Sequence, residues 1–331
     1  MLPVTLIASR KLSAVTAAAL LACAAVPALA APYTFQPVAV PNDNFTQLLG
    51  INNAGTIVGY HGAGTFAANP NKGFVFTQPN TFTSENFPNS AQTQVVGINN
   101  LGASVGFYVD AAGTTHGFDR SSGGVYTKVD APNTAFNQVL GNNDQNLEVG
   151  YSTIDPNGAT AQQAFVQRNG SFTSLGFFMP AGTGNSQATD INNADSVSGF
   201  YVDVGGVSHG FLILGGNTFT TLDVPGATGT QALGLNDAGQ VDGFYLDAKG
   251  LAHGFIEQGG LYQTVDVPGA LQTTINGIND KGQIVGFYLD AQENTVGFVG
   301  TPAPVPEPAT VALMATGLIG LWLQRRSRRK N

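Results

Sequence analysis

Cysteine, tryptophan and charged residues are scarce in this chain of 331 residues. The one cysteine, Cys23, lies in an N-terminal apolar segment, so the rest of the chain has neither a disulfide framework nor a thiolate nucleophile. The one tryptophan, Trp322, lies in a C-terminal apolar segment, so aromatic platforms in the body of the chain must use Phe or Tyr. Only 10% of the residues are charged, against about 25% in an average soluble domain.

Basic residues are especially rare between the two ends. From residue 31 to residue 306, six Lys and Arg stand against 20 Asp and Glu, which gives a net charge of −14. Such a surface repels phosphates, so nucleic acid is not expected as a partner. The 43 Gly and 17 Pro recur at regular intervals, which indicates turns and not disorder.

Residues 1–30 have the layout of a signal peptide. A basic region ends at Arg10 and Lys11, and an apolar run then leads to small residues. The signal peptidase site that this layout predicts comprises Ala28, Ala30 and Ala31. Residues 20–23 also resemble a bacterial lipobox, in which case Cys23 would carry a lipid and add a membrane anchor. We favour plain secretion, because the apolar run continues past Cys23 to the cleavage site.

The C-terminus divides into a linker over residues 301–308, an apolar segment over 309–323 and a basic tail over 324–331. A helix over 309–323 would span about 23 Å, which is short for a ~30 Å hydrocarbon core. Flanking residues and local bilayer thinning can make up the difference. The sequence therefore predicts a transmembrane helix with its basic tail on the cytoplasmic side.

The tripeptide, the helix and the Arg-rich end together resemble the PEP-CTERM sorting signal. The residues that carry this resemblance are Pro306, Glu307, Pro308, Arg325, Arg326, Arg328 and Arg329. The resemblance implies a Gram-negative bacterium, recognition of the tail by an exosortase-type processing enzyme, and delivery to the cell envelope or the extracellular matrix. An ordinary tail anchor is the alternative, and it would leave the Pro-Glu-Pro tripeptide without a meaning.

Between residues 31 and 300, one unit recurs six times, and three landmarks define it. The first is an Asn at a turn, usually within Gly-Ile-Asn, at Asn52, Asn99, Asn143, Asn192, Asn236 and Asn279, spaced 47, 44, 49, 44 and 43 residues apart. The second is a Gly before an aromatic residue, at Gly59, Gly106, Gly150, Gly199, Gly243 and Gly286. The third is a Phe, at Phe74, Phe118, Phe165, Phe211, Phe255 and Phe298. Apolar alternation between turn signals predicts short β-strands throughout.

A fourth element, a Thr- and aromatic-rich run that ends in Pro, shows how the repeats are arranged. Its clearest forms are residues 218–225 and 262–268, and it also stands alone at residues 33–41, before the first Asn landmark. The sixth copy lacks it, so six complete copies exist only if the N-terminal strand completes the last one. This permutation predicts an all-β fold, a six-bladed β-propeller of four-stranded blades closed by the N-terminal strand. A β-solenoid is the alternative.

The repeat also resembles the HAF-type extracellular repeat, which is named for a His-Ala-Phe triplet. The triplet occurs here as His116-Gly117-Phe118, His209-Gly210-Phe211 and His253-Gly254-Phe255, and the other copies have Lys72, Gln163 and Val296 at the His position. The resemblance brings no agreed activity with it.

Asp-x5-His pairs are the best candidates for a site within the repeat. They are Asp110 with His116, Asp203 with His209, and Asp247 with His253. Each pair flanks a predicted hairpin turn, so the two side chains can face each other as a metal or acid–base site. The structural alternative, which we favour, is that Asp caps its turn and His bonds to backbone or a neighbouring strand. Three of the six copies dispense with His.

Motifs of catalysis, metal binding and cofactor binding are absent: there is no nucleophile elbow, no phosphate-binding loop, no His-Glu-x-x-His and no EF-hand loop. We therefore expect no catalytic residue, metal or cofactor. The expected function is that of a non-enzymatic envelope or matrix protein that binds a polysaccharide or a surface protein. Its processing partners would be signal peptidase and an exosortase-type enzyme. The alternatives are a propeller hydrolase or lyase acting on matrix polysaccharide, and a structural spacer.

Overall fold

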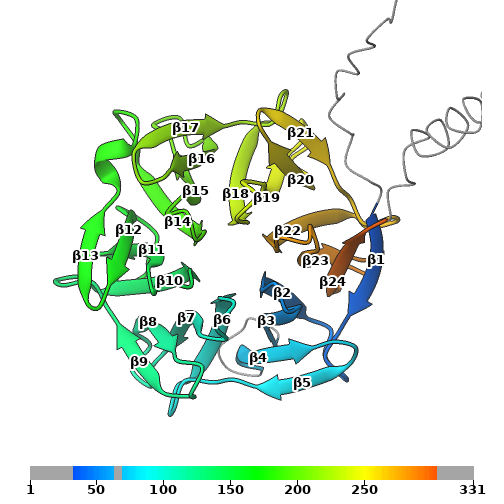
Figure 1. Ribbon diagram of the computed structural model, residues 1–331, viewed down its shortest axis with the longest axis horizontal. Coiled ribbons are helices and arrows are strands. Elements are labelled where there is room, and N and C mark those ends of the chain that lie inside the picture. Colours follow the sequence, from blue (N-terminus) through cyan, green and yellow to red (C-terminus); the bar gives the residue numbers. More distant parts are fainter. Residues whose placement is uncertain (1–32, 63–68, 304–331) are drawn as a thin grey trace, which may run out of the picture.

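The computed structural model describes residues 33–62 and 69–303, which form six antiparallel four-stranded sheets around one axis (Figure 1). Blade 1 comprises β2 (Thr46–Ile51), β3 (Thr56–His61), β4 (Lys72–Thr77) and β5 (Thr81–Ser84). Blade 2 comprises β6 (Gln92–Ile98), β7 (Ser104–Val109), β8 (Thr115–Arg120) and β9 (Tyr126–Val129). Blade 3 comprises β10 (Phe136–Asn142), β11 (Glu148–Thr153), β12 (Gln163–Arg168) and β13 (Ser171–Ser174).

The other three blades follow the same order. Blade 4 comprises β14 (Asn185–Ile191), β15 (Val197–Val202), β16 (Ser208–Leu214) and β17 (Thr218–Leu222), and a 3₁₀ turn, η1 (Gly176–Phe178), precedes it. Blade 5 comprises β18 (Gly229–Leu235), β19 (Val241–Leu246), β20 (Ala252–Gln258) and β21 (Leu261–Thr264). Blade 6 comprises β22 (Gln272–Ile278), β23 (Ile284–Leu289), β24 (Thr295–Pro302) and, as its outer strand, β1 (Tyr33–Val38).

The N-terminal strand closes the ring. β1 pairs antiparallel with β24, in a register that runs from Tyr33 opposite Pro302 to Val38 opposite Gly297. The two strands come from opposite ends of the described chain and lie side by side in Figure 1. The predicted six-bladed propeller is confirmed, and its closure excludes the β-solenoid.

The Gly landmark of the repeat has a steric cause. In β3, a Cβ on Gly59 would lie 2.1 Å from the carbonyl oxygen of Gln47 on the innermost strand. The equivalent distances in the other five blades are 2.0–2.2 Å, and each innermost strand carries a register shift one or two residues further along. Only glycine fits at this approach of two backbones, which explains why Gly recurs in every copy.

The Phe landmark fills the space between blades. The six Phe side chains of the third strands are at most 3% exposed. Phe118, for example, packs with Val58 of blade 1 and Val95 of its own blade. The core is thus a series of apolar layers between neighbouring blades, as burial of both faces of each sheet requires.

Several predictions fall outside the described residues: the signal peptide with its cleavage site, lipidation of Cys23, the transmembrane helix over 309–323 and the basic tail. Among residues 33–62 and 69–303, no helix is long and apolar enough to cross a membrane.

Candidate functional site

The Asn landmark forms a closed ring of hydrogen bonds around the propeller axis. In each blade the Asn follows the innermost strand, and its Nδ2 donates to the backbone oxygen of the Asn in the next blade, from Asn52 to Asn99 (3.1 Å) and finally from Asn279 back to Asn52 (3.1 Å). The other four links have the same geometry. The Oδ1 of Asn52 accepts the N–H groups of its own turn, at Ala54 and Thr56. Each Asn therefore caps a turn and joins two blades.

A second ring lies one residue further along, at the same mouth of the axis. There each backbone N–H donates to the side-chain Oδ1 of the next blade at 2.8–2.9 Å. Its members are Asn53, Asn100, Asp144, Asn193, Asp237 and Asp280. Because Asp144, Asp237 and Asp280 accept hydrogen bonds from neighbouring blades, ring closure alone accounts for the acidic residues at these turns. We call this end of the propeller the Asn face.

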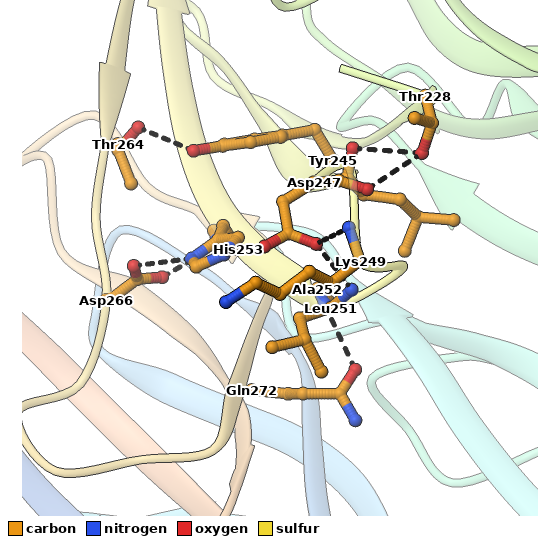
Figure 2. A network of polar contacts seen from close by, with 12 residues as sticks. Thr228, Tyr245, Asp247, Lys249, Leu251, Ala252, His253, Thr264, Asp266 and Gln272 are labelled. Carbon is orange, nitrogen blue, oxygen red and sulfur yellow. Dashed lines mark hydrogen bonds and ion pairs between the residues drawn. The ribbon is translucent and has the colours of Figure 1, made fainter. Parts of the chain in front are cut away.

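The three predicted Asp/His pairs lie at the opposite end, which we call the His face. His253 Nε2 lies 3.7 Å from Asp247 Oδ2, and His253 Nδ1 lies 2.8 Å from Asp266 Oδ2. The imidazole thus sits between two carboxylates, with the Tyr245 ring stacked on it (Figure 2). An imidazole between two carboxylates occurs three times, and we call each set a clasp: Asp110–His116–Asp130, Asp203–His209–Asp223 and Asp247–His253–Asp266.

The first Asp of each clasp also shapes its own turn. Asp247 Oδ1 accepts the N–H groups of Lys249 (2.7 Å) and Leu251 (2.9 Å), as Figure 2 shows. The N–H of Leu251, and then that of Lys249, lowers the pKa of this carboxyl. For His253, the hydrogen bond to Asp266 raises the pKa above its usual value. The clasp therefore ties the turn between the second and third strands to the end of the fourth strand, most firmly when His253 is charged.

The second Asp of each clasp is a residue that the sequence analysis missed. Asp130 and Asp223 directly follow the fourth strand of their blades, and Asp266 lies two residues beyond it, in the three blades that have the His. The equivalent positions in the blades without the His are Asn86, Gly176 and Ala39. This joint occurrence of His and Asp within single copies was visible in the sequence and would have identified the partners.

The clasps remain separate from one another, each within its own blade. Within residues 33–62 and 69–303, no three His, Cys, Asp or Glu side chains are grouped so that they could hold a metal ion. The fourth histidine, His61, bonds through Nδ1 to Asp43 at 2.8 Å and belongs to no clasp.

Two grooves on the His face each lie between a pair of neighbouring blades. One lies between blades 1 and 2 and has a volume of about 330 Å³. The other lies between blades 2 and 3 and has a volume of about 360 Å³. Both are lined from equivalent repeat positions, which are Lys72, Asn86, Ser90 and Ala91 in the first groove and His116, Asp130, Thr134 and Ala135 in the second.

A larger groove of about 600 Å³ lies between blades 2 and 3 towards the Asn face. Two acids line it where other copies of the repeat have mostly apolar residues, Asp119 on β8 and Glu148 on β11. Burial raises the pKa of Glu148 to about 7, although a hydrogen bond from Gln167 opposes the shift. Burial also raises the pKa of Asp119. Two carboxyls with raised pKa values in one groove make it a candidate for acid–base chemistry.

Comparisons with known proteins identify the C-terminal sorting signal. Residues 304–329 match the family model of the PEP-CTERM protein-sorting motif. This motif indicates a secreted protein that is processed by an exosortase and reaches the envelope or the extracellular space. The match does not extend to the repeats, so their resemblance to HAF-type repeats stays a prediction. No curated protein matches the chain.

Solved structures share the architecture at very low sequence identity. AofleA from Arthrobotrys oligospora is 11% identical, with a TM-score of 0.50 and coverage of 81% of this chain and 86% of that one. TolB from Acinetobacter baumannii is 10% identical, with a TM-score of 0.48 and coverage of 74% and 63%. The Aleuria aurantia lectin, a six-bladed β-propeller that recognises fucose, is 8% identical, with a TM-score of 0.41 and coverage of 79% and 96%. At these identities the likeness concerns the fold alone.

Proposed function

We propose that the protein is a non-enzymatic binding module of the envelope or extracellular matrix, and that it holds a polysaccharide on its His face. The observation that carries the proposal is the pair of grooves built from equivalent repeat positions in neighbouring blade pairs. A polymer of repeating units can occupy both grooves at once, and the second contact then forms at a high effective concentration. The net charge of −14 between residues 31 and 306 favours a neutral or amine-bearing polymer over a polyanion.

The test uses the purified protein and co-sedimentation with insoluble polysaccharides of stated charge. Lys72→Ala alters the first groove and Asn157→Ala the second, and both side chains are exposed. Each single variant is expected to weaken binding about threefold to tenfold, and the double variant by more than the product, since avidity is lost. Lys281→Ala, an equally charged change at an exposed position on the Asn face, is the matched control. Wild-type protein that sediments with no polysaccharide would favour a surface-protein ligand or a structural spacer.

A hydrolase or lyase is the second candidate, and the two acids in the groove of about 600 Å³ favour it. Glu148, with a pKa of about 7, is suited to donate a proton to a leaving group at neutral pH while Asp119 acts as its partner. Release of reducing ends or unsaturated products from the same polysaccharides tests this candidate. The release should be lost in Glu148→Gln and retained in Lys281→Ala; absence of any product from the wild-type protein rules the candidate out.

A further inference from the structure

A cavity of about 250 Å³ lies on the propeller axis, enclosed by the innermost strands β2, β6, β10, β14, β18 and β22. The two rings of hydrogen bonds on the Asn face occupy one mouth of this axis. Half-exposed glutamines near the starts of the innermost strands lie at the other end, toward the His face. The volume is slightly below the ~300–1,000 Å³ of pockets for drug-sized ligands, so the cavity suits a single ring-sized unit.

Blades 3, 4 and 5 supply one wall of the cavity, which carries three glutamines beside the apolar side chains of Leu140, Phe200 and Leu233. Gln138, Gln187 and Gln231 occupy the same position in β10, β14 and β18. The side chains of Gln138 and Gln231 make no hydrogen bond to any described residue, and Gln187 uses only its Nε2, which donates to Gln162. Free donors and acceptors on this wall are therefore available to hydroxyl groups.

The opposite wall is apolar. Blades 1 and 2 line it with Leu49, Ile51, Val96 and Ile98. A ligand in this cavity must place hydrogen-bonding groups on one side and C–H groups on the other. The two faces of a pyranose ring have this character.

Asp190 gives the cavity its charge preference. It stands on β14 where the other five copies have Gly, and it is the one ionisable residue among the described residues that line the cavity. Its Oδ1 accepts the N–H of Ile191 (2.8 Å), and its Oδ2 accepts the N–H of Leu235 in the next blade (3.0 Å). Because no basic side chain of residues 33–62 or 69–303 lines the cavity, an anionic group there would face a carboxyl without compensation.

We propose that the axial cavity binds one pyranose unit, neutral or amine-bearing, at the end of a glycan chain that enters from the His face. The proposal rests on the proposed function for the nature of the polymer, and it adds a site that recognises chain ends apart from the grooves. Gln138, Gln187 and Gln231 bond the hydroxyl groups, the apolar wall contacts the C–H face, and Asp190 favours an amine and rejects a carboxylate.

Binding of methyl glycosides to the full-length protein tests the cavity directly, by ligand-observed NMR with glucose, glucosamine and glucuronate. A ligand of this size is expected to bind with a dissociation constant of roughly 1 mM. Glucosamine should bind most tightly and glucuronate not detectably. Equal binding of all three sugars, or no binding of any, would overturn the proposal.

Three variants locate the site. Gln231→Ala is expected to weaken binding at least about fivefold, whereas Gln94→Ala should not, because Gln94 holds the equivalent position in β6 and does not line the cavity. Asp190→Gly restores the residue of the other copies and should abolish the preference for glucosamine. If Gln94→Ala weakens binding as much as Gln231→Ala, the cavity is not the site. The co-sedimentation assay distinguishes the two proposals. Co-sedimentation with a polysaccharide but no binding of single sugars would refute the cavity site alone. Binding of single sugars without co-sedimentation would refute the proposed function.

Discussion

Asp242 on β19 tests whether a buried carboxyl at an otherwise apolar position of the repeat destabilises the propeller. Its side chain is 0% exposed, and neither carboxylate oxygen has a hydrogen bond of good geometry among the described residues, although the nearby backbone N–H of Gly234 partly opposes the rise in its pKa. Burial, and then the nearby carboxyl of Asp190, raises its pKa well above the usual range. Four of the other five copies have Val at this position, at Val58, Val105, Val149 and Val285. We predict that Asp242→Val stabilises the protein.

The expected gain follows from the cost of an unpartnered buried polar group, about 1–3 kcal/mol. Asp242→Val should therefore raise the free energy of unfolding by about 2 kcal/mol at pH 7, and the melting temperature by roughly 4–8 °C. The gain must depend on pH. In the wild-type protein the folded-state pKa of Asp242 lies above the unfolded value of about 3.9, so stability falls as pH rises between those two values. The difference between variant and wild type should accordingly be larger at pH 7.5 than at pH 4.5.

Urea unfolding followed by circular dichroism at both pH values measures the difference in unfolding free energy. The slope of that free energy against urea concentration should be equal in the two proteins. Asp242→Asn is the matched control. It keeps the shape and the unpartnered polar group but cannot ionise, so it should remove the pH dependence and recover only part of the stability. An Asp242→Val variant that is less stable than wild type, or a difference that stays constant with pH, would refute the reasoning.

Three further predictions concern the residues that recur. Asn99→Ala removes the donor to Asn143 and the cap of its own turn, and should cost about 2–4 kcal/mol of unfolding free energy by urea titration, whereas Asn99→Asp keeps the cap and should cost less. The stability contributed by His253 is present below pH ~6.5 and is lost as pH rises through its raised folded-state pKa, so His253→Val should flatten the melting-temperature profile between pH 6 and 8. Gly243→Ala would place a Cβ 2.0 Å from a carbonyl oxygen and should prevent folding to a soluble product, whereas Gly184→Ala, with its nearest atom at 3.7 Å, should be near neutral by the same expression assay.

The architecture was predictable because the signals that specify it are local and repeat. Strand alternation and turn residues act within a few positions of themselves, and six copies of one pattern reinforce each other. The position of residues 33–41 ahead of the first complete copy was sufficient to predict that the N-terminal strand would complete the last blade, as β1 does. This prediction needed only the count of elements and the cost of an open sheet edge.

The contacts between blades were not predictable in the same way. The alternation of residues along a strand shows which side chains project from the same face of a sheet. It does not show which side chains of the next blade they contact. Glu148 and Asp119 come from different blades, and Asp190 and Asp242 from another pair, so their proximity appears only in three dimensions. The sequence did mark all four as departures from the repeat, since Asp190 replaces the Gly of five other copies and the other three acids replace mostly apolar residues.

Departures from the repeat are consequently the places to look for function in this fold. The recurring Asn, Gly and Phe residues are explained by ring closure, by close backbone approach and by packing between blades, respectively. None of these roles requires a ligand. Asp119, Glu148 and Asp242 contribute to none of them, and Asp190 joins two blades by a hydrogen bond that the Gly of the other copies cannot make. Burial makes the ionised form of each of these four acids costly. All four lie in blades 2 to 5, and Glu85, a fifth buried acid whose pKa burial raises, lies in blade 1, so the six blades differ in chemistry. A ligand that contacts these acids would bind in a single orientation, which a symmetric ring could not impose.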